Sequence, residues 1–113
     1  MHEMSLCEGV VDIIEDQARR QQFSRVRTVW LEIGELAGVE TGAMRFSFDA
    51  VAKGSVADGA RLEIIDIPGR ARCPACVRDV PVSARFDACP ECGHYPLEIL
   101  AGEEMRIREL EVS

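Results

Sequence analysis

Two cysteine pairs constrain this chain more than any other feature of its sequence. Cys73-Pro74-Ala75-Cys76 and Cys89-Pro90-Glu91-Cys92 are both C-x-x-C motifs, and residues 77–88 separate them. Each pair can bring two thiolates to one ion from a single tight turn, and two such turns complete a tetrahedron. Four thiolates leave no coordination position for a substrate water. The pattern therefore predicts a structural zinc site.

Other interpretations of the cysteines are weaker but stay open. Iron in a rubredoxin-like site needs the same four ligands and is the main alternative metal. A thioredoxin-type redox pair is disfavoured because neither motif opens a helix after a strand. Four thiols without metal are the third alternative. Cys7 is left over, and we expect it to be a small buried residue, since free cysteines are often buried.

The first 69 residues predict the order helix, strand, helix, strand. An amphipathic helix is expected from Ser5, with Ser5 and Glu8 as a capping box, until about Gln21-Gln22. Its apolar stripe comprises Leu6, Val10, Ile13, Ile14 and Ala18. Residues 26–33 alternate as a strand, 40–53 have helical spacing before Gly54, and 62–67 form a second strand before Pro68-Gly69.

Composition changes at Arg70, where a cysteine- and proline-rich stretch begins. Val80, Val82, Ala84 and Phe86 alternate in a short strand between the two cysteine pairs. Residues 105–112 form a last strand, whose apolar phase slips between Ile107 and Leu110, so we expect a bulge there. Strand-like segments flank the cysteines, which predicts that their module is inserted between neighbouring strands of one three-stranded sheet.

We therefore expect an α+β fold. A small domain of two helices on a three-stranded sheet comprises residues 1–69 and 98–113, and a zinc-ribbon-like module with four cysteine ligands, residues 70–97, is inserted before the last strand. Because so short a module buries little apolar surface, its metal should be required for folding.

Charge and composition exclude several classes of function. Acidic residues outnumber Lys and Arg by 20 to 13, giving a net charge of −7 and a pI near 4.8, which opposes nucleic-acid binding. Four arginines in the module, Arg70, Arg72, Arg78 and Arg85, keep open the alternative of a zinc-ribbon module that binds proteins or nucleic acids. The sequence has no membrane-spanning run and no secretory signal at its start, so a cytoplasmic location without membrane binding is expected.

The first three residues form a second candidate metal site. The terminal amine of Met1, the next amide nitrogen and the His2 imidazole can chelate one ion through adjacent rings, and Glu3 can supply a fourth donor. Square-planar nitrogen and oxygen coordination suits Ni(II) or Cu(II). Met1 should be retained because His2 is bulky. From residue chemistry alone, a solvated terminal His2 is the simpler interpretation.

Three features together resemble one known family. The start Met1-His2-Glu3-Met4-Ser5-Leu6-Cys7-Glu8, the segment Leu31-Glu32-Ile33-Gly34-Glu35-Leu36 and the two cysteine pairs occur in this order over the whole chain. The combination resembles the HypA/HybF family of hydrogenase nickel-insertion proteins, and it is far more specific than any one of the motifs.

The resemblance implies a nickel metallochaperone and not an enzyme. It implies that Ni(II), the transferred cargo, binds the backbone nitrogens near Met1 and His2, the imidazole of His2, and Glu3, whose carboxylate could instead contact a partner. It places structural Zn(II) on Cys73, Cys76, Cys89 and Cys92. The implied partners are a HypB-type GTPase and the large subunit of nickel–iron hydrogenase, and we expect a monomer or a weak homodimer.

His94 is the only other histidine. It could approach the nickel site, hydrogen-bond within the zinc module, or be an ordinary loop residue, so it is a possible accessory residue only. No glycine-rich phosphate loop is present, so nucleotide hydrolysis would belong to the partner.

Overall fold

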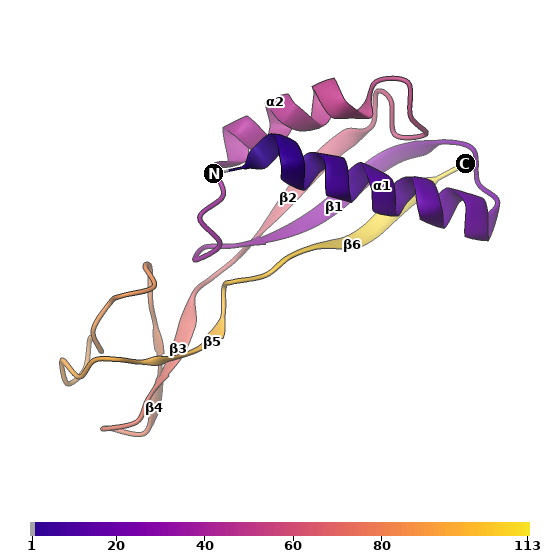
Figure 1. Cartoon of the computed structure of the whole chain (residues 1–113). Helices are drawn as coiled ribbons and strands as arrows, with labels where there is room; N and C mark the ends of the chain where they lie inside the picture. The colour runs from indigo at the N-terminus through magenta and orange to yellow at the C-terminus, as the bar shows by residue number, and fades with distance from the viewer. Residues whose placement is uncertain (1) are drawn as a thin grey trace. The chain divides into compact units, whose positions relative to one another are not determined.

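The computed structural model describes residues 2–113 and has two helices and six strands in these residues (Figure 1). The helices are α1 (Glu3–Gln21) and α2 (Thr41–Ala52). The strands are β1 (Val26–Gly34), β2 (Arg61–Ile67), β3 (Arg70–Cys73), β4 (Arg78–Pro81), β5 (Glu98–Ala101) and β6 (Met105–Val112). The expected α+β class is confirmed. Neither helix in these residues is long and apolar enough to cross a membrane.

The first sheet has the strand order β2-β1-β6. At its ends, Glu35 N–H donates to Ile67 O, whereas Gly34 N–H donates to Glu104 O and Ser113 N–H to Arg25 O. These bonds show that β2 runs parallel to β1 and that β6 runs antiparallel to it. A parallel pair needs a crossover connection, and helix α2 provides it between β1 and β2. The cysteine module follows β2 and precedes β6 in the chain. These two strands are the edges of the sheet, and β1 lies between them. The expectation that these strands are neighbours was wrong.

Helix α1 begins earlier than the sequence predicted. It starts at Glu3, with His2 at the N-cap position, so the predicted capping box at Ser5 was wrong. The buried stripe is correspondingly Glu3, Cys7, Val10, Val11, Ile14 and Ala18. Ile13, which we expected in the core, is 54% exposed, because it lies about 100° around the helix from Ile14.

Helix α2 and strands β1 and β2 agree with the sequence to within a residue or two. Glu40 caps α2: its carboxylate accepts from Gly42 N–H at 3.0 Å and from Ala43 N–H at 2.5 Å. The helices pack against each other. The largest fully buried side chains among the described residues include Ile14, Val29, Leu31, Met44 and Phe48.

Strand β4 is shorter than predicted. The alternation suggested a strand through Phe86, but β4 ends at Pro81. The Asp87 carboxylate accepts from the backbone N–H groups of Ser83 and Ala84 at 2.9 and 3.0 Å, which closes a turn instead. Phe86 is consequently 77% exposed.

Strand β6 contains the predicted irregularity. Thr28 and Glu32 are four residues apart in β1 and share a face. The Thr28 hydroxyl donates to Glu111 of β6, and Arg106 of β6 donates to Glu32. These two partners in β6 are five residues apart. A regular strand would place residues five apart on opposite faces. The burial alternation along β6 also slips between Arg108 and Glu109. Both observations indicate a bulge at Arg108-Glu109.

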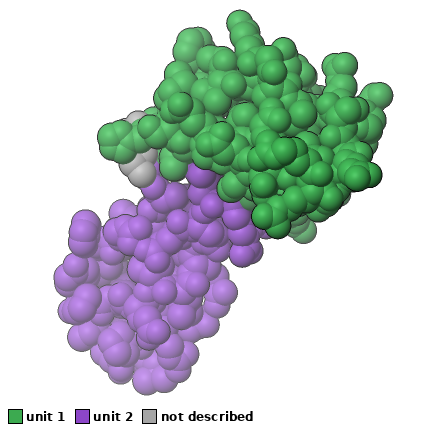
Figure 2. Space-filling view, turned by 45° about the vertical axis from the view of Figure 1, so that its right-hand side comes forward, with its two compact units in different colours: residues 1–31, 39–64, 107–113 green, residues 32–38, 65–106 purple. Residues whose placement is uncertain are grey.

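The chain divides into two units (Figure 2). Unit 1 comprises residues 1–31, 39–64 and 107–113, and unit 2 comprises 32–38 and 65–106. Unit 2 holds the second sheet, of order β4-β3-β5, whose strand β3 pairs antiparallel with both neighbours. Its core consists of Leu36, Ala71, Cys73, Val80, Val82 and Cys89. This division groups residues 32–38 with the cysteines, whereas the sequence suggested a module of residues 70–97.

Candidate metal centres

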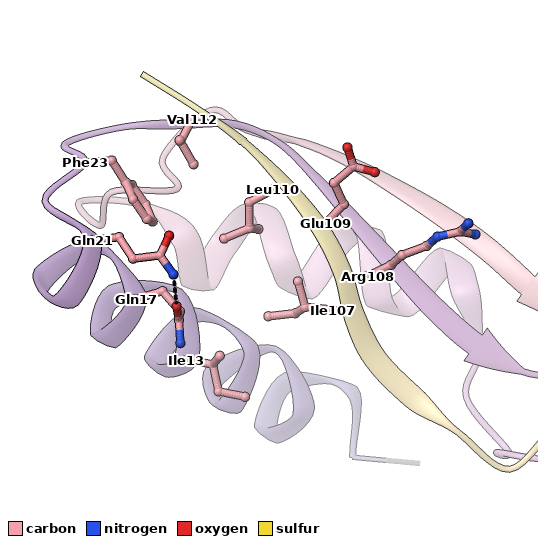
Figure 3. Close-up of a pocket in the computed structure, with 9 residues that line it drawn as sticks. All are labelled: Ile13, Gln17, Gln21, Phe23, Ile107, Arg108, Glu109, Leu110 and Val112. Carbon is pink, nitrogen blue, oxygen red and sulfur yellow. Dashed lines mark hydrogen bonds between the residues drawn. The ribbon is translucent and has the colours of Figure 1, made fainter.

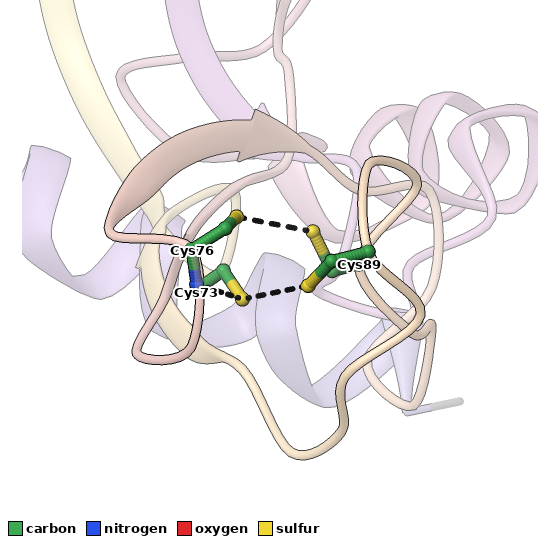
Figure 4. Close-up of side chains that lie close together, drawn as sticks. Cys73, Cys76 and Cys89 are labelled. Carbon is green, nitrogen blue, oxygen red and sulfur yellow. Dashed lines mark hydrogen bonds between the residues drawn. The ribbon is translucent and has the colours of Figure 1, made fainter.

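The four paired cysteines converge on one point in unit 2. Figure 4 labels three of them, Cys73, Cys76 and Cys89, whose side chains lie close together. Their sulfur atoms all lie within 4.8 Å of one another. Cys73 Sγ is 3.6 Å from Cys92 Sγ, and Cys76 Sγ is 3.8 Å from Cys89 Sγ. Zn–S bonds of about 2.3 Å in a tetrahedron place the sulfurs about 3.8 Å apart. The donor set and its spacing therefore fit a zinc ion with four thiolate ligands.

The two C-x-x-C turns have matching backbones. Val77 N–H donates to Cys73 O at 2.9 Å, and Gly93 N–H donates to Cys89 O at 2.8 Å. The residue after each pair has a left-handed conformation, with φ of 57° at Val77 and 78° at Gly93. Glycine adopts this conformation at no steric cost, whereas a β-branched valine does not. The turn at Val77 is therefore held in a strained form of the geometry that Gly93 adopts freely.

Hydrogen bonding and burial give the thiols of the first pair different proton affinities. The Cys76 backbone amide donates to Cys73 Sγ and lowers the pKa of that thiol to about 6. Burial raises the pKa of the Cys76 thiol to about 12. Cys73 is consequently a thiolate at neutral pH, which is the form that binds metals. His94 contributes its backbone: its carbonyl accepts from Cys89 N–H at 2.8 Å, and its amide donates to the Cys92 sulfur.

At the other end of the chain, His2 is exposed at the start of α1. Its carbonyl accepts the first helical hydrogen bond, from Leu6 N–H at 3.0 Å. Its imidazole makes no hydrogen bond that caps the helix. The ring is thus not used to satisfy the amides of the first turn. The predicted ligand Met1 lies outside the described residues.

Glu3 and Cys7 attach the start of α1 to the start of α2. Glu3 Oε2 accepts from Glu40 N–H at 3.1 Å, and Cys7 Sγ donates to Met44 O at 3.5 Å. Glu3 is buried, and the pKa of its carboxyl lies below the usual range, mainly because of the Glu40 amide. Burial, reinforced by Glu3, raises the pKa of Cys7 to about 11, so this cysteine is a neutral buried thiol, as the sequence predicted.

Comparison with known proteins agrees with these observations. The family model described as "Hydrogenase/urease nickel incorporation, metallochaperone, hypA" matches residues 1–112. The chain belongs to the HypA family. Over 112 residues it is 62% identical to the hydrogenase maturation factor HypA of Alkalilimnicola ehrlichii and 55% identical to that of Azotobacter chroococcum, with 99% of each chain covered. This confirms the resemblance found in the sequence.

The fold is also that of a HypA structure. The solution structure of the Ni metallochaperone HypA from Helicobacter pylori is 26% identical and has a TM-score of 0.73, and the match covers 99% of this chain and 97% of that one. The HypA family is a family of nickel-incorporation metallochaperones that act in hydrogenase maturation, and this chain is one of its members.

Sequence reasoning found the cysteine cluster but missed Glu40, the residue to which Glu3 binds. Glu40 immediately precedes α2, where Ser, Thr, Asp or Asn is the usual cap. Its place at the start of the predicted helix, residues 40–53, was a signal of capping. Nothing in the sequence signalled that its amide would bond to Glu3, because the two residues are distant along the chain.

Proposed function

We propose that this chain carries Ni(II) at its amino terminus and delivers it to the large subunit of nickel–iron hydrogenase. The proposed ligands are the backbone nitrogens near Met1 and His2 and the His2 imidazole, with Glu3 beside them. The observation that carries the proposal is an exposed imidazole that does not cap its helix, on the residue just before Glu3, whose carboxylate bonds to the Glu40 amide.

The charges around this position support the proposal. The amino ends of α1 and α2 both carry partial positive charge, which would repel a cation. The carboxylates of Glu3 and Glu40 oppose that charge, and each accepts a hydrogen bond from a backbone amide at the start of α2. Because the Glu3 carboxylate is bonded to the Glu40 amide, we infer that Glu3 supports nickel binding mainly by positioning His2 and by its negative charge.

The cysteines are proposed to hold structural zinc through Cys73, Cys76, Cys89 and Cys92. When bound, zinc would link the two turns and so stabilise a sheet whose strands have four residues each. The residues themselves supply the preformed turns and a thiolate at Cys73. The inserted module, residues 70–97, is accordingly a scaffold and not the transfer site.

Transfer requires no catalytic group on this chain. A terminal site with an open edge lets ligands of another protein replace its own one at a time, and a HypB-type GTPase would supply nucleotide hydrolysis. We place this transfer in the cytoplasm, where cysteines stay reduced; none of the five cysteines forms a disulfide.

The alternative, a zinc-ribbon module for nucleic acids, has less support. Its arginines are paired with acids of the same unit: Arg70 and Arg72 with Asp79, Arg78 with Glu91, and Arg85 with Glu103. These pairs neutralise the positive charge that phosphate binding would need.

Nickel titration of His2→Ala beside His94→Ala tests the proposal. Because His2 is a direct ligand, its loss should weaken nickel binding by more than the 10–100-fold typical of an outer-shell partner, whereas His94→Ala should leave the affinity near that of the parent. Isothermal calorimetry of zinc-loaded protein measures both. Unchanged affinity in His2→Ala would contradict the proposed site.

A further inference from the structure

The pocket between α1 and β6 in unit 1 holds no nucleophilic side chain (Figure 3). Gln21 Nε2 donates to Gln17 Oε1 at 2.6 Å, so these two amides bond to each other. Figure 3 shows Arg108 and Glu109 on the side of β6 away from α1. The remaining lining is apolar: Ile13, Phe23, Ile107, Leu110 and Val112. This pocket therefore offers apolar contact and no reactive group, unlike the cysteine cluster of unit 2.

The four cysteines of that cluster differ in exposure. Cys73 and Cys89 are 0% and 3% exposed, Cys76 is half-buried, and Cys92 is exposed. The backbone beside Cys92 is open as well, because a Cβ added to Gly93 would meet no atom within 4 Å other than those of its chain neighbours. A small solute can therefore reach Cys92 first, whereas the fold covers the other cysteines of the cluster.

Metal binding keeps Cys92 in its reactive form. Cysteine ligands bind zinc as thiolates, and the thiolate is also the form that attacks an oxidant. Four thiolates around one divalent ion leave a net negative charge on the cluster, so its sulfur atoms are rich in electrons. Cys7 is the opposite case: it is fully buried, and burial raises the pKa of its thiol to about 11. Cys92 thus combines a thiolate with exposure.

A second thiolate lies next to Cys92. Cys73 Sγ is 3.6 Å from Cys92 Sγ, a contact that joins the turn after β3 to the turn before β5. These two strands pair directly, with Arg72 opposite Glu98. A disulfide between Cys73 and Cys92 would therefore link the same two turns that zinc links.

We propose that Cys92 is a site of oxidation by hydrogen peroxide and that Cys73 then forms a disulfide with it. The Cys92 thiolate attacks one peroxide oxygen, so an S–O bond forms, the O–O bond breaks, and the departing hydroxide takes a proton from water to leave a sulfenic acid. The Cys73 thiolate attacks that sulfur, and hydroxide leaves as the S–S bond forms. Two thiolates lose two electrons, and peroxide with two protons becomes two waters.

Oxidation exchanges the metal for disulfides without dismantling the module. The first disulfide removes two of the four thiolate ligands, so zinc is released. A second peroxide joins Cys76 to Cys89, whose sulfurs are 3.8 Å apart, by the same steps. Both bonds connect the two turns, so the sheet β4-β3-β5 should persist in the oxidised, zinc-free chain. This proposal rests on the proposed zinc site and is independent of nickel binding.

Peptide mapping tests which sulfurs react. Zinc-loaded protein receives less than one equivalent of hydrogen peroxide, remaining thiols are alkylated, and the chain is cleaved after Arg and Glu. Cleavage after Glu91 separates Cys89 from Cys92, so a link from peptide 73–78 to peptide 92–98 identifies Cys92 by mass, and fragmentation locates Cys73. We expect this link, with one zinc ion released per disulfide formed. A first disulfide within either C-x-x-C motif, a sulfonic acid at Cys92, or zinc that stays bound in excess peroxide would overturn the proposal.

Cys7→Ala is the control variant, since it removes the thiol that should not react. It should lose zinc at the rate of the parent chain, and slower loss would implicate Cys7 instead of Cys92. Hydrogen exchange then compares oxidised protein with protein stripped of the same amount of zinc by a chelator. The amides of β3, β4 and β5 should stay protected after oxidation and lose protection after chelation. Equal loss in both samples would contradict the disulfide-linked module, whereas an untreated chain without zinc would contradict the zinc site itself.

Discussion

Glu3 is the residue through which the start of α1 is joined to the start of α2. Its carboxylate accepts from the Glu40 amide, which holds the pKa of Glu3 below its ordinary value of 4.5. A depressed carboxyl pKa contributes stability above the unfolded-state value, and this contribution is lost as the pH falls through the folded-state pKa. The bond should therefore persist at neutral pH and break only in acid.

A titration of the Glu40 amide tests this bond. In the parent chain, the NMR shift of the Glu40 N–H should follow the ionisation of Glu3, with a midpoint below 4.5. In Glu3→Gln the side-chain oxygen can still accept the bond but has no charge to lose, so that step should disappear. Glu8→Gln, an exposed change on the same helix, should leave it intact. An unchanged Glu40 titration in Glu3→Gln would refute the contact.

Among the elements, the two cysteine turns each contain one residue in the left-handed conformation, Val77 in the first and Gly93 in the second. Replacing these two residues should change the free energy of unfolding in opposite directions. Val77→Gly should stabilise the zinc-loaded protein by about 1 kcal/mol, because a non-glycine residue in this conformation costs about 1–2 kcal/mol and the added flexibility of glycine returns part of it. Gly93→Val should destabilise by about 1–3 kcal/mol. Denaturant unfolding with zinc present measures both, and a loss of stability in Val77→Gly would show that the turn is not strained.

The elements were predictable wherever local pattern and tertiary packing agree. The alternation of Val29, Leu31 and Ile33 indicated β1, and Gly54 marked the end of α2. The start of α1 was missed because the bond from Glu3 to distant Glu40 outweighs the local cap at Ser5. The end of β4 was missed because the Asp87 carboxylate captures two backbone amides that a longer strand would have used.

At the candidate sites, spacing alone identified the cysteines, because two turns of fixed geometry can reach one ion. The strands that bring these turns together, β3 and β5, were not resolved in the sequence, since each has only four residues and its register depends on pairing with distant segments. The nickel site was suggested by chemistry at His2 and by family resemblance. The contact proposed to position it, between Glu3 and Glu40, follows from tertiary structure.

At the scale of the whole molecule, zinc should support unit 2 and leave the helices of unit 1 folded. Cys89→Ala should lose zinc and the amide protection of β3, β4 and β5, while α1 keeps its protection, because only the second sheet depends on the cysteine turns. Cys7→Ala is the matched control: it also removes a buried thiol but should retain one zinc per chain. Zinc analysis and hydrogen exchange check both, and retention of zinc by Cys89→Ala would contradict the four-thiolate site.

The most direct test of the central claim uses the position of the amino group. A variant with one glycine before Met1 keeps every side chain but moves the terminal amine away from His2, which breaks the chelate rings. We predict that nickel affinity falls by more than about 100-fold, which is more than the loss of an outer-shell partner would cause, while zinc content stays the same. Equal nickel affinity in the extended and parent chains would contradict a nickel site at the amino terminus.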